Sequence, residues 1–101
     1  MKPLLFALAA TLASSLATAD PGMDLAQKKN CLACHALDKK VVGPAYKDIA
    51  AKYGKDKDAV TKLAEKIQKG STGTWGPIPM PPNQVTPEEA SQLAKWVLTV
   101  K

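Results

Sequence analysis

Hydrophobic residues along the chain recur at the three- and four-residue spacing that is typical of amphipathic helices. Two segments show this spacing most clearly. In residues 58–69 and after residue 86, the apolar positions are Val60, Leu63, Ala64 and Ile67, then Ala90, Leu93, Ala94, Val97 and Leu98. No segment alternates between apolar and polar residues as a half-buried strand does. The pattern therefore predicts an all-α domain.

Residues that favour helix ends divide this domain into about four short helices. Asp20-Pro21 predicts the start of a first helix, which we expect to end near Cys34. A second helix is expected over residues 45–53. The third, over 58–69, and the fourth, which starts with the capping box of Thr86-Pro87-Glu88-Glu89, flank a loop over 70–82. This loop is rich in glycine and proline, so we expect it to be stiff.

The N-terminal segment differs from the rest of the chain. Lys2 precedes an apolar run over residues 4–13, and Ala17-Thr18-Ala19 has the small-x-small pattern at which signal peptidase cleaves. We therefore expect residues 1–19 to be a signal peptide that is removed after export, and residues 20–101 to form a single domain. The apolar run is too short to span a bilayer, so no stable membrane insertion is predicted.

The charge balance limits the possible partners. The chain has 14 lysines, no arginine and 9 acidic residues, and its net charge is +5 at pH 7. The lysines are dispersed rather than clustered, so nucleic-acid binding is not expected. A dispersed positive charge favours acidic partner surfaces.

Cys31-Leu32-Ala33-Cys34-His35 has the C-x-x-C-H pattern of covalent haem attachment. Positions i, i+3 and i+4 share one face of a helical turn, so both thiols can bond to one haem while the imidazole points at its iron. A thioredoxin-like redox pair would need a βαβ setting, and a zinc site would need more ligands than 2 cysteines and 1 histidine supply. A simple disulfide would leave the adjacent histidine unexplained.

The second axial ligand of such a haem follows by elimination. His35 is the only histidine, Met1 lies in the expected signal peptide, and Met23 is too close to the attachment motif to reach the opposite haem face. Met80 lies in the proline-rich loop, where a stiff backbone can hold its thioether against iron, although many methionines only fill core space. His/Met ligation raises the reduction potential.

Several further motifs resemble one family. After Cys31–His35 come, in order, Val42-Gly43-Pro44-Ala45, Lys69-Gly70-Ser71, Trp75-Gly76-Pro77-Ile78-Pro79-Met80-Pro81-Pro82-Asn83 and Leu93-Ala94-Lys95-Trp96-Val97-Leu98. Together they resemble the small bacterial class I monohaem cytochromes c of the c-551/c-552 type. The resemblance implies a class I cytochrome c fold wrapped around one haem c, a periplasmic location and a monomeric protein. It also implies redox partners such as nitrite reductase, terminal oxidase, cytochrome c peroxidase or a bc-type complex.

The resemblance also implies roles for residues around the iron ligands. Pro44 would offer its carbonyl to the second imidazole nitrogen of His35, and the Asn83 amide would donate to the Met80 sulfur. The alternatives are a simple bend at residue 44 and an ordinary turn residue at 83.

Other residues are expected near the haem propionates or in the core. Trp75 would direct its indole N–H at a propionate or else form part of the core. Lys66 stands where family members often carry arginine, so a forked donor is replaced by a point charge. Asn30 replaces a common glycine and tolerates left-handed backbone angles. Trp96 is expected to pack against the first helix.

These expectations lead to a single-electron carrier rather than an enzyme. The main alternative is a haem enzyme or gas-binding sensor with an open or labile sixth iron position, and another is a permanent electron-entry subunit of a larger complex. The surface at Pro77, Ile78 and Pro79 is the expected partner contact, with lysines at its rim.

Overall fold

The computed structural model describes residues 20–101, and the expected signal peptide lies outside this range. The described chain forms four α-helices and one short 3₁₀-helix. Their order is α1 (Pro21–Lys28), η1 (Cys31–Ala33), α2 (Tyr46–Tyr53), α3 (Ala59–Lys69) and α4 (Pro87–Val97). Within residues 20–101 the only β-type pairs are two isolated bridges, His35 with Lys40 and Ser71 with Met80. The all-α prediction is therefore confirmed.

Local capping fixes the start of two helices. The Asp20 side chain accepts a hydrogen bond of 2.9 Å from the backbone N–H of Gly22 at the start of α1. At α4, the Thr86 hydroxyl and the Glu89 carboxylate each accept the other residue's backbone N–H at 3.0 Å. Both starts agree with the capping residues in the sequence, because a cap needs only neighbours within one helical turn.

The predicted end of the first helix is wrong. We expected it to continue to near Cys34, but α1 ends at Lys28 and Cys31 begins a separate 3₁₀ turn. The interruption lies at Asn30, whose backbone is left-handed with a φ of 63°. A residue in this conformation cannot continue a right-handed helix, and Asn adopts it more readily than most side chains.

Helix α4 lies at the centre of the packing. It contacts α1, α2 and α3, and its buried residues are Ala90, Leu93, Ala94, Trp96 and Val97. Trp96 packs against Gly22 of α1, as expected, and a Cβ at residue 22 would lie 2.1 Å from the Trp96 Cβ. Glycine therefore allows the two helices to approach closely.

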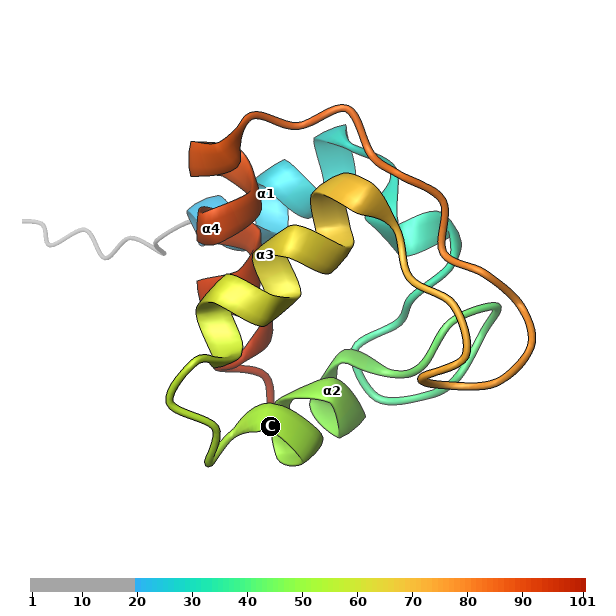
Figure 1. Ribbon diagram of the computed structural model, residues 1–101. Helices are drawn as coiled ribbons and strands as arrows, with labels where there is room; N and C mark the ends of the chain where they lie inside the picture. The colour runs from blue at the N-terminus through green and yellow to red at the C-terminus, as the bar shows by residue number, and fades with distance from the viewer. Residues whose placement is uncertain (1–19) are drawn as a thin grey trace, which may run out of the picture.

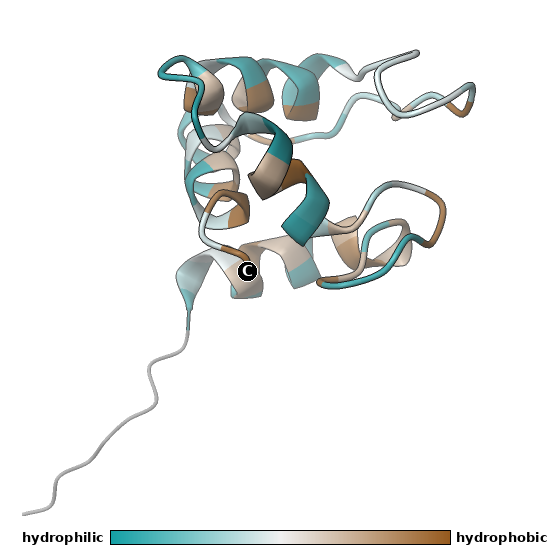
Figure 2. Cartoon of the chain, turned by 90° about the horizontal axis from the view of Figure 1, so that it is seen from below, coloured by the Kyte–Doolittle hydropathy of each residue, from teal (hydrophilic) through white to brown (hydrophobic). Residues whose placement is uncertain are grey.

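The arrangement leaves α2 and two loops facing the three packed helices. Figure 1 shows α1, α3 and α4 gathered together, with α2 opposite them and the segment after α3 running along the side of the molecule. In Figure 2, hydrophobic residues lie mainly where the helices face one another, and further hydrophobic segments lie on the protruding loops. No helix within residues 20–101 is long and apolar enough to cross a membrane.

Candidate functional site

One cavity of about 290 Å³ is lined by all the residues that the sequence marked as candidates for the site. They come from the 3₁₀ turn, the segment after it, the end of α3 and the loop before α4. These residues are Cys31, Cys34, His35, Pro44, Lys66, Trp75, Met80 and Asn83. The tertiary structure therefore brings together residues that lie far apart in the sequence.

The 3₁₀ turn brings the three residues of the attachment motif to this cavity. Backbone N–H groups of Cys34 and His35 both donate to the Cys31 carbonyl, at 3.2 and 3.1 Å. The two cysteines are separate thiols, partly exposed, and are not joined in a disulfide. Burial raises the pKa of the Cys31 thiol, which keeps it protonated in the chain before any attachment.

His35 is the only buried polar or charged residue of the described range, with an exposed fraction of 8%. Its Nδ1 donates to the Pro44 carbonyl oxygen at 2.7 Å, which is the contact that the sequence led us to expect. A carbonyl can only accept, so Nδ1 carries the proton and Nε2 keeps its lone pair in the neutral imidazole. This is the tautomer that can bind a metal through Nε2.

Two residues that the sequence did not mark as part of the site also hold this imidazole. The Tyr46 ring stacks on it, with ring centroids 4.9 Å apart and an interplanar angle of 27°. Gly43, which we read only as part of a bend, leaves room for it, because a Cβ there would lie 2.6 Å from the His35 Cε1. Desolvation on burial raises the pKa of the Tyr46 phenol, so it stays neutral. In the sequence, the only indication that Tyr46 contacts this imidazole was its position two residues after Pro44.

Met80 is held by its backbone at the base of the loop. Ser71 N–H donates to the Met80 carbonyl at 3.0 Å, and Met80 N–H donates to the Ser71 carbonyl at 2.8 Å. Gly70 precedes this pair with a φ of +88°, and a Cβ there would lie 2.6 Å from the Met80 carbonyl oxygen. The thioether therefore projects from a fixed backbone rather than from a free loop.

Trp75 is less buried than the sequence reading implied. It lines the cavity, yet its exposed fraction is 39%, and the Lys52 ammonium lies over its ring at 5.6 Å from the centroid. Trp75 thus lies outside the cluster of buried residues formed by the helices, and its expected contact with a propionate stays a prediction. Lys66, in the last turn of α3, is half-buried at the cavity wall.

Asn83 binds backbone carbonyls in this structure. Its Nδ2 donates to the Ile67 carbonyl at 2.9 Å, with a longer contact to the Pro81 carbonyl at 3.4 Å. Its backbone N–H also donates to Ile67, at 3.2 Å. Asn83 thus satisfies a carbonyl at the end of α3, where helices leave such groups unpaired. Its expected donation to the Met80 sulfur stays a prediction.

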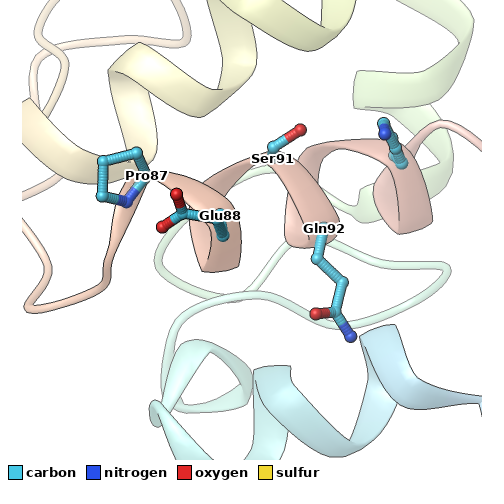
Figure 3. Close-up of a pocket in the computed structure, with 5 residues that line it drawn as sticks. Pro87, Glu88, Ser91 and Gln92 are labelled. Atoms are coloured by element: carbon cyan, nitrogen blue, oxygen red, sulfur yellow. The ribbon is translucent and has the colours of Figure 1, made fainter.

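A second depression, of about 470 Å³, has no comparable chemistry. Figure 3 shows it on the outer face of α4. Its lining residues are Pro87, Glu88, Ser91, Gln92 and Lys95. All belong to one helix, and none can hold a haem or complete a ligand set with a neighbouring element.

The donor set of the cavity that contains the attachment motif fits a covalently attached haem. Its lining is mostly apolar, from Ile49, Leu63, Ile67, Leu93 and Val97 among others, as a porphyrin ring requires. Two unpaired thiols lie on one turn beside an imidazole with a free nitrogen, and a thioether belongs to a separate loop. Such a set suits covalent attachment of haem through two thioether bonds, and it leaves a nitrogen and a sulfur as candidate iron ligands.

Comparisons with known proteins show the family to which the chain belongs. The Cytochrome c family model matches residues 19–101. Cytochrome c-552 of Nitrosomonas europaea is 57% identical over 95% of this chain and 92% of its own length. Cytochrome c-551 of Pseudomonas denitrificans is 56% identical over 79% of this chain and 98% of its own length.

A solved structure supports the fold directly. Wild-type Nitrosomonas europaea cytochrome c552 aligns with a TM-score of 0.76 and 60% identity, covering 78% of this chain and 99% of that one. The predicted class I fold is thereby confirmed. The chain belongs to the cytochrome c family, as a small class I monohaem protein that carries one covalently attached haem c and transfers electrons.

Proposed function

We propose that this protein is a periplasmic single-electron carrier whose haem is bound covalently through Cys31 and Cys34. His35 and Met80 would be the two axial iron ligands. When bound, the haem supplies a one-electron Fe(III)/Fe(II) couple, and the protein sets its potential and excludes water. The residues that line the cavity would do both.

The observation that carries this proposal is the 2.7 Å hydrogen bond from His35 Nδ1 to the Pro44 carbonyl. It leaves Nε2 as the free donor, restrains the ring and increases the basicity of the ligand. Burial of this polar ring, at 8% exposure, is easier to account for when Nε2 also has a partner. The iron of the attached haem would be that partner.

The backbone pairing of Met80 with Ser71 supports a filled sixth position rather than an open one. A thioether fixed in this way on the cavity wall would bind ferrous iron well, since it is soft and neutral. The chain has no second histidine to act as a distal acid or base. These features favour a carrier over a haem enzyme or gas sensor.

The remaining cavity residues would support the haem. Lys66 and the Trp75 indole N–H would donate to the propionates, and the Asn83 amide would stabilise the Met80 side chain. Lys66 offers a compact charge without the fork of an arginine, so its propionate contact would be less directional.

Redox partners would bind where apolar loop residues surround the cavity. The large hydrophobic residues that are exposed in the described range are Leu37, Val41, Val42, Trp75 and Ile78. Three of them, Val42, Trp75 and Ile78, line the cavity together with Lys29, Lys40 and Lys66. An apolar patch with a positive rim suits a transient complex with an acidic partner surface. Electron transfer to such a partner should slow as salt is raised.

The export part of the proposal rests on residues 1–19, which lie outside the described range. Cell fractionation and N-terminal sequencing test it directly. A mature protein that starts at Asp20 and is recovered from the periplasm would support it. A haem-containing cytoplasmic protein that keeps Met1 would contradict it.

The ligand set is tested by spectroscopy of Met80→Ala, with Met23→Leu as the matched control. Met23 packs against the core from α1 and does not line the cavity. The wild type and the control should show the sulfur-to-ferric charge-transfer band, and Met80→Ala should lose it. Survival of the band in Met80→Ala, or rapid carbon monoxide binding to the reduced wild type, would overturn the proposal.

A further inference from the structure

The loop over residues 71–80 is fastened at its base but not, by its backbone, at its tip. The Ser71–Met80 hydrogen bonds close the base. Residues 72–79 are all exposed, and none of them takes part in the backbone hydrogen bonds found outside the helices. Gly73 and Gly76 both have positive φ, and a Cβ at either would meet no neighbouring atom. Within the chain itself, only side-chain contacts are therefore available to fasten this tip, whose residues Trp75, Pro77, Ile78 and Pro79 also line the cavity.

Lys52 and Trp75 supply such a contact. The Lys52 ammonium lies over the Trp75 ring, 5.6 Å from the ring centroid, within the range of a cation–π interaction. Lys52 belongs to the last turn of α2, whereas Trp75 lies in the middle of the loop. The contact thus joins the tip of the loop to the helix that faces the α1, α3 and α4 group (Figure 1).

Lys52 differs from several other lysines of the described range in its partner. Lys29, Lys62 and Lys69 pair with carboxylates of Glu89, Asp56 and Glu65. Lys52 forms no such ion pair among residues 20–101, and the indole face is the partner that the structure gives it. In the sequence, this lysine is one of many dispersed along the chain, and nothing there indicated a particular partner for it.

We propose that Lys52 is a positioning residue that fastens the tip of the Met80 loop to α2 through the ring of Trp75. Its role is to keep Trp75 at the cavity rim and to reduce the population of states in which the loop opens. Since Met80 closes the same loop, opening would favour loss of the thioether from iron. This last consequence rests on the proposed function, whereas the contact itself does not.

The contact is tested in the haem-loaded protein with Lys52→Gln, Lys52→Arg and Lys55→Gln. Lys52→Arg keeps a cation for the ring, and Lys55→Gln removes the same charge from an exposed site outside the contact. In the reduced wild type, NMR should show Lys52 side-chain protons shifted upfield by the Trp75 ring. Lys52→Gln should lower the backbone order parameters of residues 72–79 and leave those of α4 unchanged. Lys52→Arg and Lys55→Gln should retain wild-type order.

A second measurement detects opening of the loop from the binding of an added ligand to the iron. Imidazole added to the ferric protein binds only after the loop opens and Met80 leaves, so its apparent affinity reports the open population. Because Lys52→Gln loses an exposed cation–π contact, its apparent affinity for imidazole should be about two- to fivefold higher than that of the wild type. Lys52→Arg and Lys55→Gln should bind imidazole like the wild type.

The two measurements separate failure of this inference from failure of the proposed ligand set. Unchanged order parameters in Lys52→Gln, or an equal effect of Lys55→Gln, would overturn the positioning role of Lys52. Absence of the charge-transfer band from the wild type would instead overturn Met80 ligation. In that case the NMR result would still decide whether Lys52 holds the loop.

Discussion

Gly43 lies against the imidazole of His35 so closely that a Cβ at residue 43 would come within 2.6 Å of Cε1 and 3.0 Å of Nδ1. On another side the same ring is stacked on Tyr46, and its Nδ1 is bonded to Pro44. The ring therefore has little freedom to move away. His35 can adopt this orientation because residue 43 is glycine and has no side chain.

Gly43→Ala should consequently destabilise the haem-loaded protein. The added methyl must displace the imidazole, and overpacking of this kind costs about 1–3 kcal/mol. Denaturant titration gives the change in the free energy of unfolding. Val41→Ala, at a neighbouring residue with 50% exposure, is the control and should change stability little. Equal stability of Gly43→Ala and the wild type would show that the ring can shift without loss.

Gly22→Ala should destabilise the protein although it replaces glycine within a helix. Such a change normally stabilises an exposed helix by about 0.5–1 kcal/mol. Here the new Cβ would overlap Trp96, whose Cβ would be 2.1 Å away, so α1 and α4 must separate. We expect a loss of about 1–3 kcal/mol in the free energy of unfolding, measured by thermal or denaturant unfolding. A gain in stability would contradict the close packing of the two helices.

Thr86→Ala should remove the cap of α4. The hydroxyl accepts the Glu89 N–H at 3.0 Å, and loss of such a cap costs about 1 kcal/mol. The effect should be visible as a lower denaturation midpoint with an unchanged slope. Thr61→Ala, at an exposed position inside α3, is the control and should not destabilise. Equal losses in the two variants would argue against a specific capping role.

Asp56→Asn should reduce stability near neutral pH but not in strong acid. The Lys62 ammonium donates to the Asp56 carboxylate at 2.7 Å, and Asp58 N–H donates to it at 2.8 Å. These bonds lower the pKa of Asp56 in the folded state, with the Lys62 contact as the larger cause. The folded state therefore favours the ionised carboxyl.

The sign of the pH dependence follows from this shift. The stability contributed by ionised Asp56 is fully present above the pKa of the unfolded chain, about 3.9, and is lost as pH falls through the lower folded value. The difference in the free energy of unfolding between wild type and Asp56→Asn should become smaller in that pH range. Unfolding curves from pH 7 to pH 2 measure it, and a difference independent of pH would contradict the ionic origin. High salt should also reduce it, since the pair is exposed.

The amino-acid sequence by itself determined the local features of this protein. Helix caps at Asp20 and Thr86, the hydrophobic spacing of α3 and α4 and the attachment motif each depend on residues within a few positions of one another. Interactions of this range are encoded in a short stretch of chain, so α3 agrees with its predicted bounds to within a residue and α4 begins where it was predicted to begin. Even here the left-handed Asn30 ended α1 earlier than the pattern indicated.

The tertiary structure alone decided which distant residues meet. The close fit of Gly43 against His35, the bond from Asn83 to Ile67 and the position of Lys52 over Trp75 join segments that are separated along the chain. No local pattern encodes such contacts, because they depend on how four helices and two loops fill one volume. The sequence therefore indicated the candidate residues of the haem site, and the fold determined how they are held.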